Sequence, residues 1–262
     1  MTEEKNIGLV LSGGGTRGIA HVGAWRGLTE LGFQPKVIVG CSMGAIIGTM
    51  IAAGKTAQEM ETFVLEQRVM TLFQWPITKL GLSKLTKFEQ RLLTFLGIKT
   101  FEELTIPLII NATNLTTGEP IIYTTGQLWS ALRATISIPG LFAPIRRHDD
   151  IIVDGGILYE HPFSLLPLNV DKFLMVNCSP REHIKKHNVS AVDILRASLN
   201  VMQNTITELR LANVPTENYR LIEPRVQGRN IFENEKQFQS LIDLGAEAVK
   251  TDNESLRQFI HQ

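Results

Sequence analysis

An α/β fold built on a mostly parallel sheet is predicted by three features of the sequence. Short apolar runs at residues 7–11 and 37–41 alternate with longer stretches whose apolar residues recur at helical spacing. A glycine, Gly32 or Gly54, follows each of the first two expected helices, as is common where helices end. Hydrophobic residues make up 44% of the 262 positions, which is enough for a sizeable core. Alternating strands and helices favour parallel pairing with right-handed crossovers.

The same patterns place the remaining elements along the chain. Beyond the two strands already named, strands are expected at residues 107–114, 119–124, 151–153, 173–177 and 219–222. Helices are expected at residues 17–31, 43–53, 57–70, 86–95, 127–135, 190–212 and 235–260. The sequence contains neither an internal repeat nor an evident linker. We therefore expect a single domain over residues 1–262, with a motif-bearing core at about 7–180 and a helical part at about 190–262.

The amino-acid composition argues against some kinds of binding partner and site. Lys and Arg together number 26 and so do Asp and Glu, so no polyanion such as nucleic acid is favoured. The two cysteines, Cys41 and Cys178, lack the spacing of a metal site and are expected to be buried thiols. Residues 1–6 are charged and do not read as a signal peptide, and the apolar run at 43–54 is too short to span a membrane. We expect a cytoplasmic protein without metal or cofactor.

A serine lies between the second expected strand and the helix that follows it. Residues 40–44 read G-C-S-M-G, which matches the G-x-S-x-G pattern with Gly40 and Gly44 around Ser42. In that pattern a sharp strand-to-helix turn exposes the serine oxygen as a nucleophile.

A glycine-rich loop follows the first expected strand. Gly13, Gly15 and Gly18 satisfy G-x-G-x-x-G, the pattern of dinucleotide sites. Such sites also need an acidic residue at the end of the next strand, and residues 40–42 contain none. A second interpretation is that the loop's amides bind the oxyanion of an acyl-transfer intermediate. A third is a tight turn that simply requires glycine.

A nucleophilic serine needs a partner that takes its proton. Four of the six histidines lie inside a helix or in polar surroundings, where we expect exposed or hydrogen-bonded side chains: His21, His183, His187 and His261. His148 and His161 flank the sequence I-I-V-D-G-G and remain candidates for a triad. Asp154 ends that strand, and Gly155 and Gly156 permit close approach of another element. A shielded Asp154 carboxylate is therefore an alternative base, and an ordinary Asp-Gly turn is the other interpretation.

Taken in order, these motifs resemble those of the patatin-like phospholipase family. The glycine loop at 13–18, the serine motif at 40–44 and the D-G-G motif at 154–156 occur in the family's order. Residues 137–144, S-I-P-G-L-F-A-P, also match the family's S-x-P-x-x-F-x-P segment. The resemblance covers the region from the first strand to about Pro162. It implies a three-layer α/β/α fold and a hydrolase that cleaves acyl esters of lipids.

The resemblance also implies roles for individual residues. Ser42 is the nucleophile and Asp154 the general base of a Ser-Asp dyad that acts through an acyl-enzyme. The amides of Gly14 and Gly15 form the oxyanion hole, and Arg17 holds the loop or favours nearby negative charge. The supporting glycines of the loop and turns are Gly13, Gly18, Gly40, Gly44, Gly155 and Gly156.

The sequence departs from the family pattern in two places. Glu160 stands where the family often has Asn, and Cys41 replaces the commoner Thr before the nucleophile. Neither residue supplies a reacting atom, but Glu160 is expected to change local hydrogen bonding.

The implied partner is a lipid or another acyl ester, with transient contact at a membrane surface. Residues 71–85 mix apolar and basic side chains, as suits a lipid-touching flap, or alternatively a core-packing connection. The helix at 190–212 carries apolar residues at helical spacing, which we interpret as core or subunit contact, or else as a lipid-channel wall: Val192, Leu195, Leu199, Met202, Ile206 and Leu209. A regulatory or lipid-binding protein that retains the fold without catalysis is the alternative function.

Overall fold

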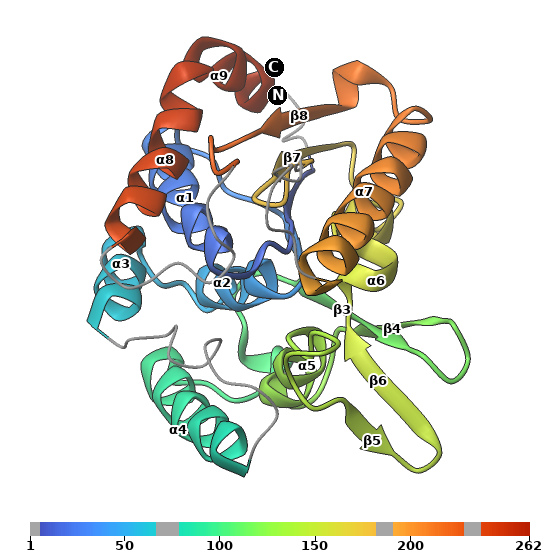
Figure 1. Ribbon diagram of the computed structural model, residues 1–262. Helices are drawn as coiled ribbons and strands as arrows, with labels where there is room; N and C mark the ends of the chain where they lie inside the picture. Colours follow the sequence, from blue (N-terminus) through green and yellow to red (C-terminus); the bar gives the residue numbers. More distant parts are fainter. Residues whose placement is uncertain (1–5, 67–78, 182–190, 228–236) are drawn as a thin grey trace.

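The computed structural model describes residues 6–66, 79–181, 191–227 and 237–262. A central sheet with the strand order β5-β6-β3-β2-β1-β7-β8 runs through these residues, and β4 pairs with β3 outside that path (Figure 1). The strands are β1 (Ile7–Leu11), β2 (Val37–Gly40), β3 (Leu108–Asn114), β4 (Pro120–Tyr123), β5 (Ile145–Arg147), β6 (Asp150–Asp154), β7 (Lys172–Val176) and β8 (Tyr219–Ile222).

The pairing is parallel in one half of the sheet and antiparallel at one edge. Strands β3, β2, β1, β7 and β8 are parallel neighbours. Strands β4 and β6 run antiparallel to β3, and β5 runs antiparallel to β6. The mostly parallel sheet predicted from the alternating elements is confirmed, and the antiparallel edge carries the strand that ends at Asp154.

Helices cover both faces of the sheet (Figure 1). The helices are α1 (Ala20–Glu30), α2 (Met43–Ala52), α3 (Ala57–Glu66), α4 (Lys79–Leu96), α5 (Leu128–Thr135), α6 (Gly156–Tyr159), α7 (Ala191–Leu211), α8 (Phe238–Thr251) and α9 (Asn253–His261), with shorter 3-10 turns between some of them. Among the described residues, no helix is both long and apolar enough to cross a membrane.

Alternate residues of β1 belong to two different parts of the core. Leu9 and Leu11 are buried in the large cluster that contains residues of α1, α2 and α8. Val10 points to the other side and packs with Phe163 and Phe173, against Leu211 of α7. Because successive side chains of a strand face opposite sides, a strand buried on both faces reads as a continuous apolar run. The three-layer α/β/α architecture follows from this double burial.

Several expected boundaries differ from the observed ones. The strand β5 was not predicted, because its sequence I-R-R is short and polar and two of its three residues are exposed. The helix expected at 235–260 is two helices that separate at Asp252. The segment at 71–85, interpreted as a lipid-touching flap or a core-packing connection, lies outside the described residues as far as residue 78, and α4 begins at the next residue.

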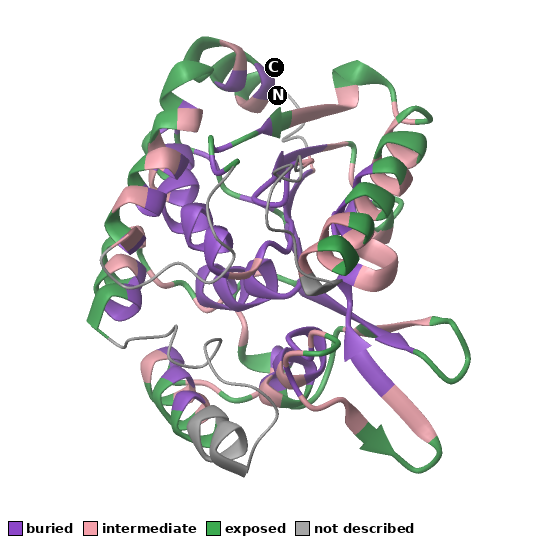
Figure 2. Cartoon of the chain, in the orientation of Figure 1, coloured by how far each residue is buried: buried purple, intermediate pink, exposed green. Residues whose placement is uncertain are grey.

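The long helix α7 exposes apolar residues that were interpreted as core or subunit contact, or else as a lipid-channel wall. Leu195, Met202 and Leu209 are 61%, 58% and 66% exposed, and the exposed residues run along the outer side of α7 in Figure 2. These positions are therefore not part of the core, and the subunit contact and the lipid-channel wall stay predictions. Spacing alone locates an apolar face but does not show what covers it.

Helices α1 and α8 pack so closely that their backbones touch. A Cβ atom at Gly245 would overlap the carbonyl oxygen of Ala20. We expect Gly245→Ala to lower the free energy of unfolding by about 1–3 kcal/mol, the usual cost of overpacking. This loss occurs although alanine is the better helix former by about 1 kcal/mol. Urea denaturation measures the change. The matched variant Glu247→Ala, on the exposed face of α8, should stay within about 0.5 kcal/mol of the parent, and equal stabilities for the two variants would contradict this packing.

Candidate active site

The glycine loop after β1 contains positions whose backbone conformation and close contacts suit only glycine. Gly14 has a φ angle of 139° and Gly15 one of 58°, both in the region that side chains disfavour. A Cβ atom at Gly14 would lie 2.6 Å from the carbonyl oxygen of Cys178. The Arg17 side chain is buried beneath the loop and its Nε donates to the Gly14 carbonyl at 3.3 Å. The guanidinium therefore contributes to holding the loop in place.

A buried histidine supports the same loop from below. His21 is completely buried, and its Nε2 lies 2.9 Å from the carbonyl oxygen of Ser12. Its Nδ1 lies 3.6 Å from the Cys178 thiol, and the Cys178 amide donates to the Ser12 hydroxyl at 2.8 Å. Burial lowers the pKa of His21 to about 4, so the ring is neutral at physiological pH. This histidine is a structural residue, as its position inside a helix predicted.

Ser42 lies on a strained turn between β2 and α2. Its φ and ψ angles are 52° and −120°, an unusual conformation for a residue with a side chain. The turn is held by two hydrogen bonds, from Cys41 N to Leu11 O at 3.1 Å and from Ser42 N to the Thr135 hydroxyl at 2.9 Å. A Cβ atom at Gly44 would overlap the carbonyl oxygen of Leu11, so α2 can approach the glycine loop only with glycine there. Strain of this kind is the property expected of a nucleophile elbow.

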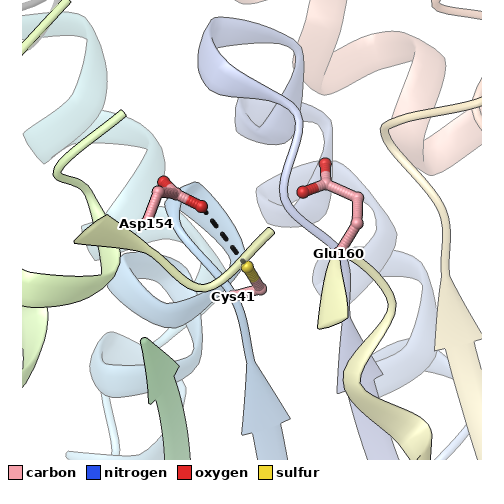
Figure 3. Close-up of side chains that lie close together, drawn as sticks. All are labelled: Cys41, Asp154 and Glu160. Atoms are coloured by element: carbon pink, nitrogen blue, oxygen red, sulfur yellow. Dashed lines mark hydrogen bonds between the residues drawn. The ribbon is translucent and has the colours of Figure 1, made fainter. Parts of the chain in front are cut away.

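The sheet register brings Asp154 level with Ser42. Gly40 at the end of β2 pairs with Ile110, and Asp154 at the end of β6 pairs with Ala112, two residues further along β3. Strand β3 lies between the two strands, and their carboxyl ends lie two residues apart along it, so Ser42, two residues beyond Gly40, comes close to the level of Asp154. The Asp154 carboxyl is buried, and its Oδ1 accepts hydrogen bonds from Gly156 N at 2.7 Å and from the Cys41 thiol at 3.8 Å (Figure 3).

The environment of Asp154 favours its protonated form. Burial raises its pKa from 3.8 to about 7, and the nearby charge of Glu160 adds to the increase. Hydrogen bonding from Gly156 N, Ser42 and Cys41 acts in the opposite direction. Its Oδ2 atom is buried without a hydrogen-bond partner of good geometry among the described residues. Candidate nucleophiles and bases often align fully only when substrate binds.

The structure places the candidate histidine bases away from this role. The His161 ring is buried, with Nε2 2.8 Å from Asn177 Oδ1 and Nδ1 2.9 Å from the Thr207 hydroxyl, so both nitrogens are occupied. His148 is exposed in the turn between β5 and β6. The support of His161 by Asn177 and Thr207 was not predicted, because those residues are far away in the sequence.

Three buried donor atoms lie close together beside Ser42. One atom each from Cys41, Asp154 and Glu160 lies within 4.8 Å of the others. A thiol must lose its proton to bind a metal ion, and burial raises the pKa of Cys41 well above its ordinary value. These three groups form one buried cluster next to the turn of Ser42.

A groove with a volume of about 540 Å³ runs between α3 and α4, with Phe63 and Phe95 among its lining residues. None of its lining residues belongs to the three motifs. We therefore assign the candidate site by its chemistry at Ser42 and Asp154 and not by this groove.

The raised pKa of Asp154 makes a prediction for stability. Between pH 4 and 7 the folded protein keeps a proton on Asp154 that the unfolded chain releases, so this residue makes the folded state less stable as pH rises. The difference between the pKa of Asp154 in the folded protein and in the unfolded chain changes the free energy of unfolding by at most about 4 kcal/mol. We expect Asp154→Asn to gain stability relative to the parent as pH rises through this range. Urea denaturation at about pH 4.5 and about pH 7.5 measures the difference, and parallel pH profiles for the two proteins would contradict it.

Comparisons with known proteins identify relatives of this chain. The model of the patatin-like phospholipase family matches residues 9–167. An uncharacterised NTE family protein of Mycobacterium tuberculosis is 31% identical over 179 residues, which are 67% of this chain and 50% of the relative. Lysophospholipase NTE1 of Cryptococcus neoformans is 29% identical over 194 residues, 68% of this chain and 12% of that protein. The chain thus spans half the length of the mycobacterial relative and much less of the fungal one.

Solved structures agree on the fold. The crystal structure of VipD from Legionella pneumophila covers 96% of this chain with a TM-score of 0.57 at 15% identity, and this chain covers 67% of VipD. The structure of ExoU with SpcU from Pseudomonas aeruginosa covers 97% of this chain with a TM-score of 0.51 at 17% identity, with 53% of that chain covered. At such low identity these matches support the architecture alone.

Proposed function

The chain belongs to the patatin-like phospholipase family, and on that premise we propose that it hydrolyses acyl esters of lipids with Ser42 as nucleophile and Asp154 as general base. The observation that carries the proposal is the buried Asp154 carboxyl beside the strained turn of Ser42, at the glycine loop after β1. A serine hydroxyl on an elbow, a shielded carboxyl and a loop rich in amides are the parts that acyl transfer requires.

The reaction proceeds in two steps. In the first step, the Ser42 hydroxyl attacks the ester carbonyl while the Asp154 carboxylate takes its proton. Collapse of the tetrahedral intermediate expels the alcohol, which receives the proton from Asp154, and leaves an acyl-enzyme. In the second step, a water molecule gives its proton to Asp154 and attacks the acyl group. The fatty acid leaves as the proton returns to Ser42.

We assign to the glycine loop the binding of the negatively charged oxygen of the tetrahedral intermediate. The amides of Gly14 and Gly15 belong to the bend that the positive φ angles create, and Arg17 fixes that bend through the Gly14 carbonyl. A single donor of an oxyanion hole contributes about 2.7–4 kcal/mol in other serine hydrolases. A rigid loop suits this role, because its amides must already be in place when the negative charge develops.

A general base whose pKa lies near 7 is suited to this chemistry. The elevated proton affinity of Asp154 makes its carboxylate a stronger base than an exposed aspartate, and the carboxylate is still populated at neutral pH. His161 serves instead as a structural residue that links the end of α6 to β7 and α7 through Asn177 and Thr207. The dyad therefore operates without an imidazole.

The proposed substrates are phospholipids or lysophospholipids, because the fungal relative is named a lysophospholipase. Contact with the lipid surface is assigned to α7. Its exposed apolar residues, at 41–66% exposure, are Ile194, Leu195, Val201, Met202 and Leu209. The same helix contacts the D-G-G turn, since Gln203 Nε2 donates to the carbonyl oxygen of Gly156 at 2.8 Å. Surface binding and the candidate site are thus connected through one helix.

Covalent labelling tests the nucleophile and the base. We expect the wild-type protein to react with a fluorophosphonate probe and to hydrolyse p-nitrophenyl butyrate. Ser42→Ala should abolish both reactions, and Asp154→Asn should reduce hydrolysis by at least about 100-fold, the lower range for loss of a general base.

Two variants serve as controls for that experiment. Ser130→Ala, at an exposed serine of α5, and His148→Ala should retain wild-type labelling and turnover. A folded wild type that is not labelled would contradict the hydrolase and favour a regulatory or lipid-binding role. Loss of activity in His148→Ala equal to that in Asp154→Asn would contradict the dyad.

Binding to vesicles tests the assigned surface. The double variant Leu195→Ser/Met202→Ser removes two exposed apolar side chains without emptying the core, so its stability should change little. Sedimentation with phosphatidylcholine vesicles should show weaker binding, whereas hydrolysis of soluble p-nitrophenyl butyrate should be unchanged. Equal vesicle binding by variant and parent would show that lipid contact occurs elsewhere.

A further inference from the structure

Glu160 is a buried acid that the two-step reaction does not use. It follows α6 and is 8% exposed, compared with 6% for Asp154. Figure 3 shows the carboxyl groups of Asp154 and Glu160 on either side of the Cys41 thiol. One donor atom from each of these three side chains lies within 4.8 Å of the others, with Asp154 at the start of the D-G-G turn and Glu160 at the end of α6.

The backbone fixes Glu160 in this place. Its carbonyl oxygen accepts a hydrogen bond from Gly13 N at 3.0 Å, which ties the end of α6 to the glycine loop. Its carboxyl group fills the space where Gly13 and Gly156 lack side chains. A Cβ atom at Gly13 would lie 2.5 Å from Glu160 Oε1, and one at Gly156 would overlap Oε2. The glycines of two motifs therefore admit this carboxyl into the site.

The described groups that face Asp154 come from two turns and from Glu160. The β2–α2 turn supplies the Cys41 thiol and the Ser42 hydroxyl, and the D-G-G turn supplies the amide of Gly156. Burial is the largest cause of the raised pKa of Asp154, and the charge of Glu160 is the next. A negative charge at the position of Glu160 favours the protonated form of Asp154 over its carboxylate form.

The two cysteines near the site feel the same charges. Burial raises the pKa of Cys41, and the charges of Asp154 and then of Glu160 raise it further. Burial also raises the pKa of Cys178, but there the buried cation of the glycine loop, Arg17, acts against the increase. The negative charge of Glu160 also raises the pKa of Cys178, so it acts on both cysteines as well as on Asp154, and Arg17 opposes it only at Cys178 among these three groups.

We propose that Glu160 is a positioning residue whose buried carboxylate, held between Gly13 and Gly156, makes Asp154 a stronger base by repelling negative charge there. The inference rests on the proposed function for its catalytic meaning, but the electrostatic effect is a property of the folded chain. When Asp154 takes the Ser42 proton, the repulsion between the two carboxylates is relieved. Proton transfer is therefore easier than it would be with Asp154 alone.

Direct titration of Asp154 separates this inference from the hydrolase proposal. Protein labelled with ¹³C at the aspartate carboxyl carbons is titrated by NMR in the Ser42→Ala background, and Asp154→Asn identifies the resonance. We expect Glu160→Gln to lower the measured pKa of Asp154 by about 1 unit, because a neighbouring like charge is lost. Glu160→Asp withdraws the charge by one methylene and should give a smaller decrease. Glu217→Gln, at an exposed acid, should leave the value unchanged.

Activity supplies the second measurement. With Ser42 present, the acidic limb of kcat/KM for p-nitrophenyl butyrate should move to lower pH by the same amount in Glu160→Gln as Asp154 does in the titration. An unchanged Asp154 pKa in folded Glu160→Gln overturns the inference whether or not the protein is a hydrolase. If that variant does not fold, an unchanged value in folded Glu160→Asp overturns it. A shifted pKa in a protein whose wild type hydrolyses nothing would support the role of Glu160 and reject the proposed function.

Discussion

The site depends on the pairing of β3 with β2 on one side and with β6 on the other. Because β2 is parallel to β3 and β6 is antiparallel to it, the carboxyl ends of β2 and β6 point toward each other and lie two residues apart along β3, at Ile110 and Ala112. Ser42 and Asp154 are therefore brought together by register, although they lie far apart in the sequence. A slip of one residue in the β3–β6 pair would turn the Asp154 side chain to the opposite face of the sheet. The hydrogen bond from Asp154 N to the Ser137 carbonyl at 3.0 Å adds a second restraint on this register.

The same region concentrates features that destabilise a folded chain. A strained serine backbone, a buried carboxyl with a raised pKa and a second acid beside it all cost free energy. The surrounding core offsets that cost, since β1, β2 and β3 are completely buried and α2 consists entirely of buried residues. The rigidity of this framework is also what keeps the glycine loop and the elbow in a fixed geometry. Stability and the proposed chemistry thus draw on the same packing.

The fold and the motif positions could be predicted from local patterns, whereas the connections between motifs could not. Apolar runs and glycine spacing located β1, β2 and α2 closely, because these elements are buried and their periodicity is undisturbed. The short polar strand β5 and the break between α8 and α9 at Asp252 gave no comparable signal. Glu160 was noticed only as a departure from a motif, since its contact with Gly13 depends on tertiary structure. The apolar face of α7 was recognised, but its exposure depends on which elements pack beside it.

The central claim is that the Ser42 hydroxyl reacts beside the Asp154 carboxyl and under the amides of the glycine loop. A crystal structure of the protein after reaction with a fluorophosphonate tests it most directly. We predict phosphorus bonded to Ser42 Oγ, a phosphoryl oxygen within hydrogen-bond distance of the Gly14 and Gly15 amides, and an Asp154 carboxyl oxygen within hydrogen-bond distance of Ser42 Oγ or of the adduct. An adduct on another residue, or an Asp154 carboxyl turned away from Ser42, would contradict the account.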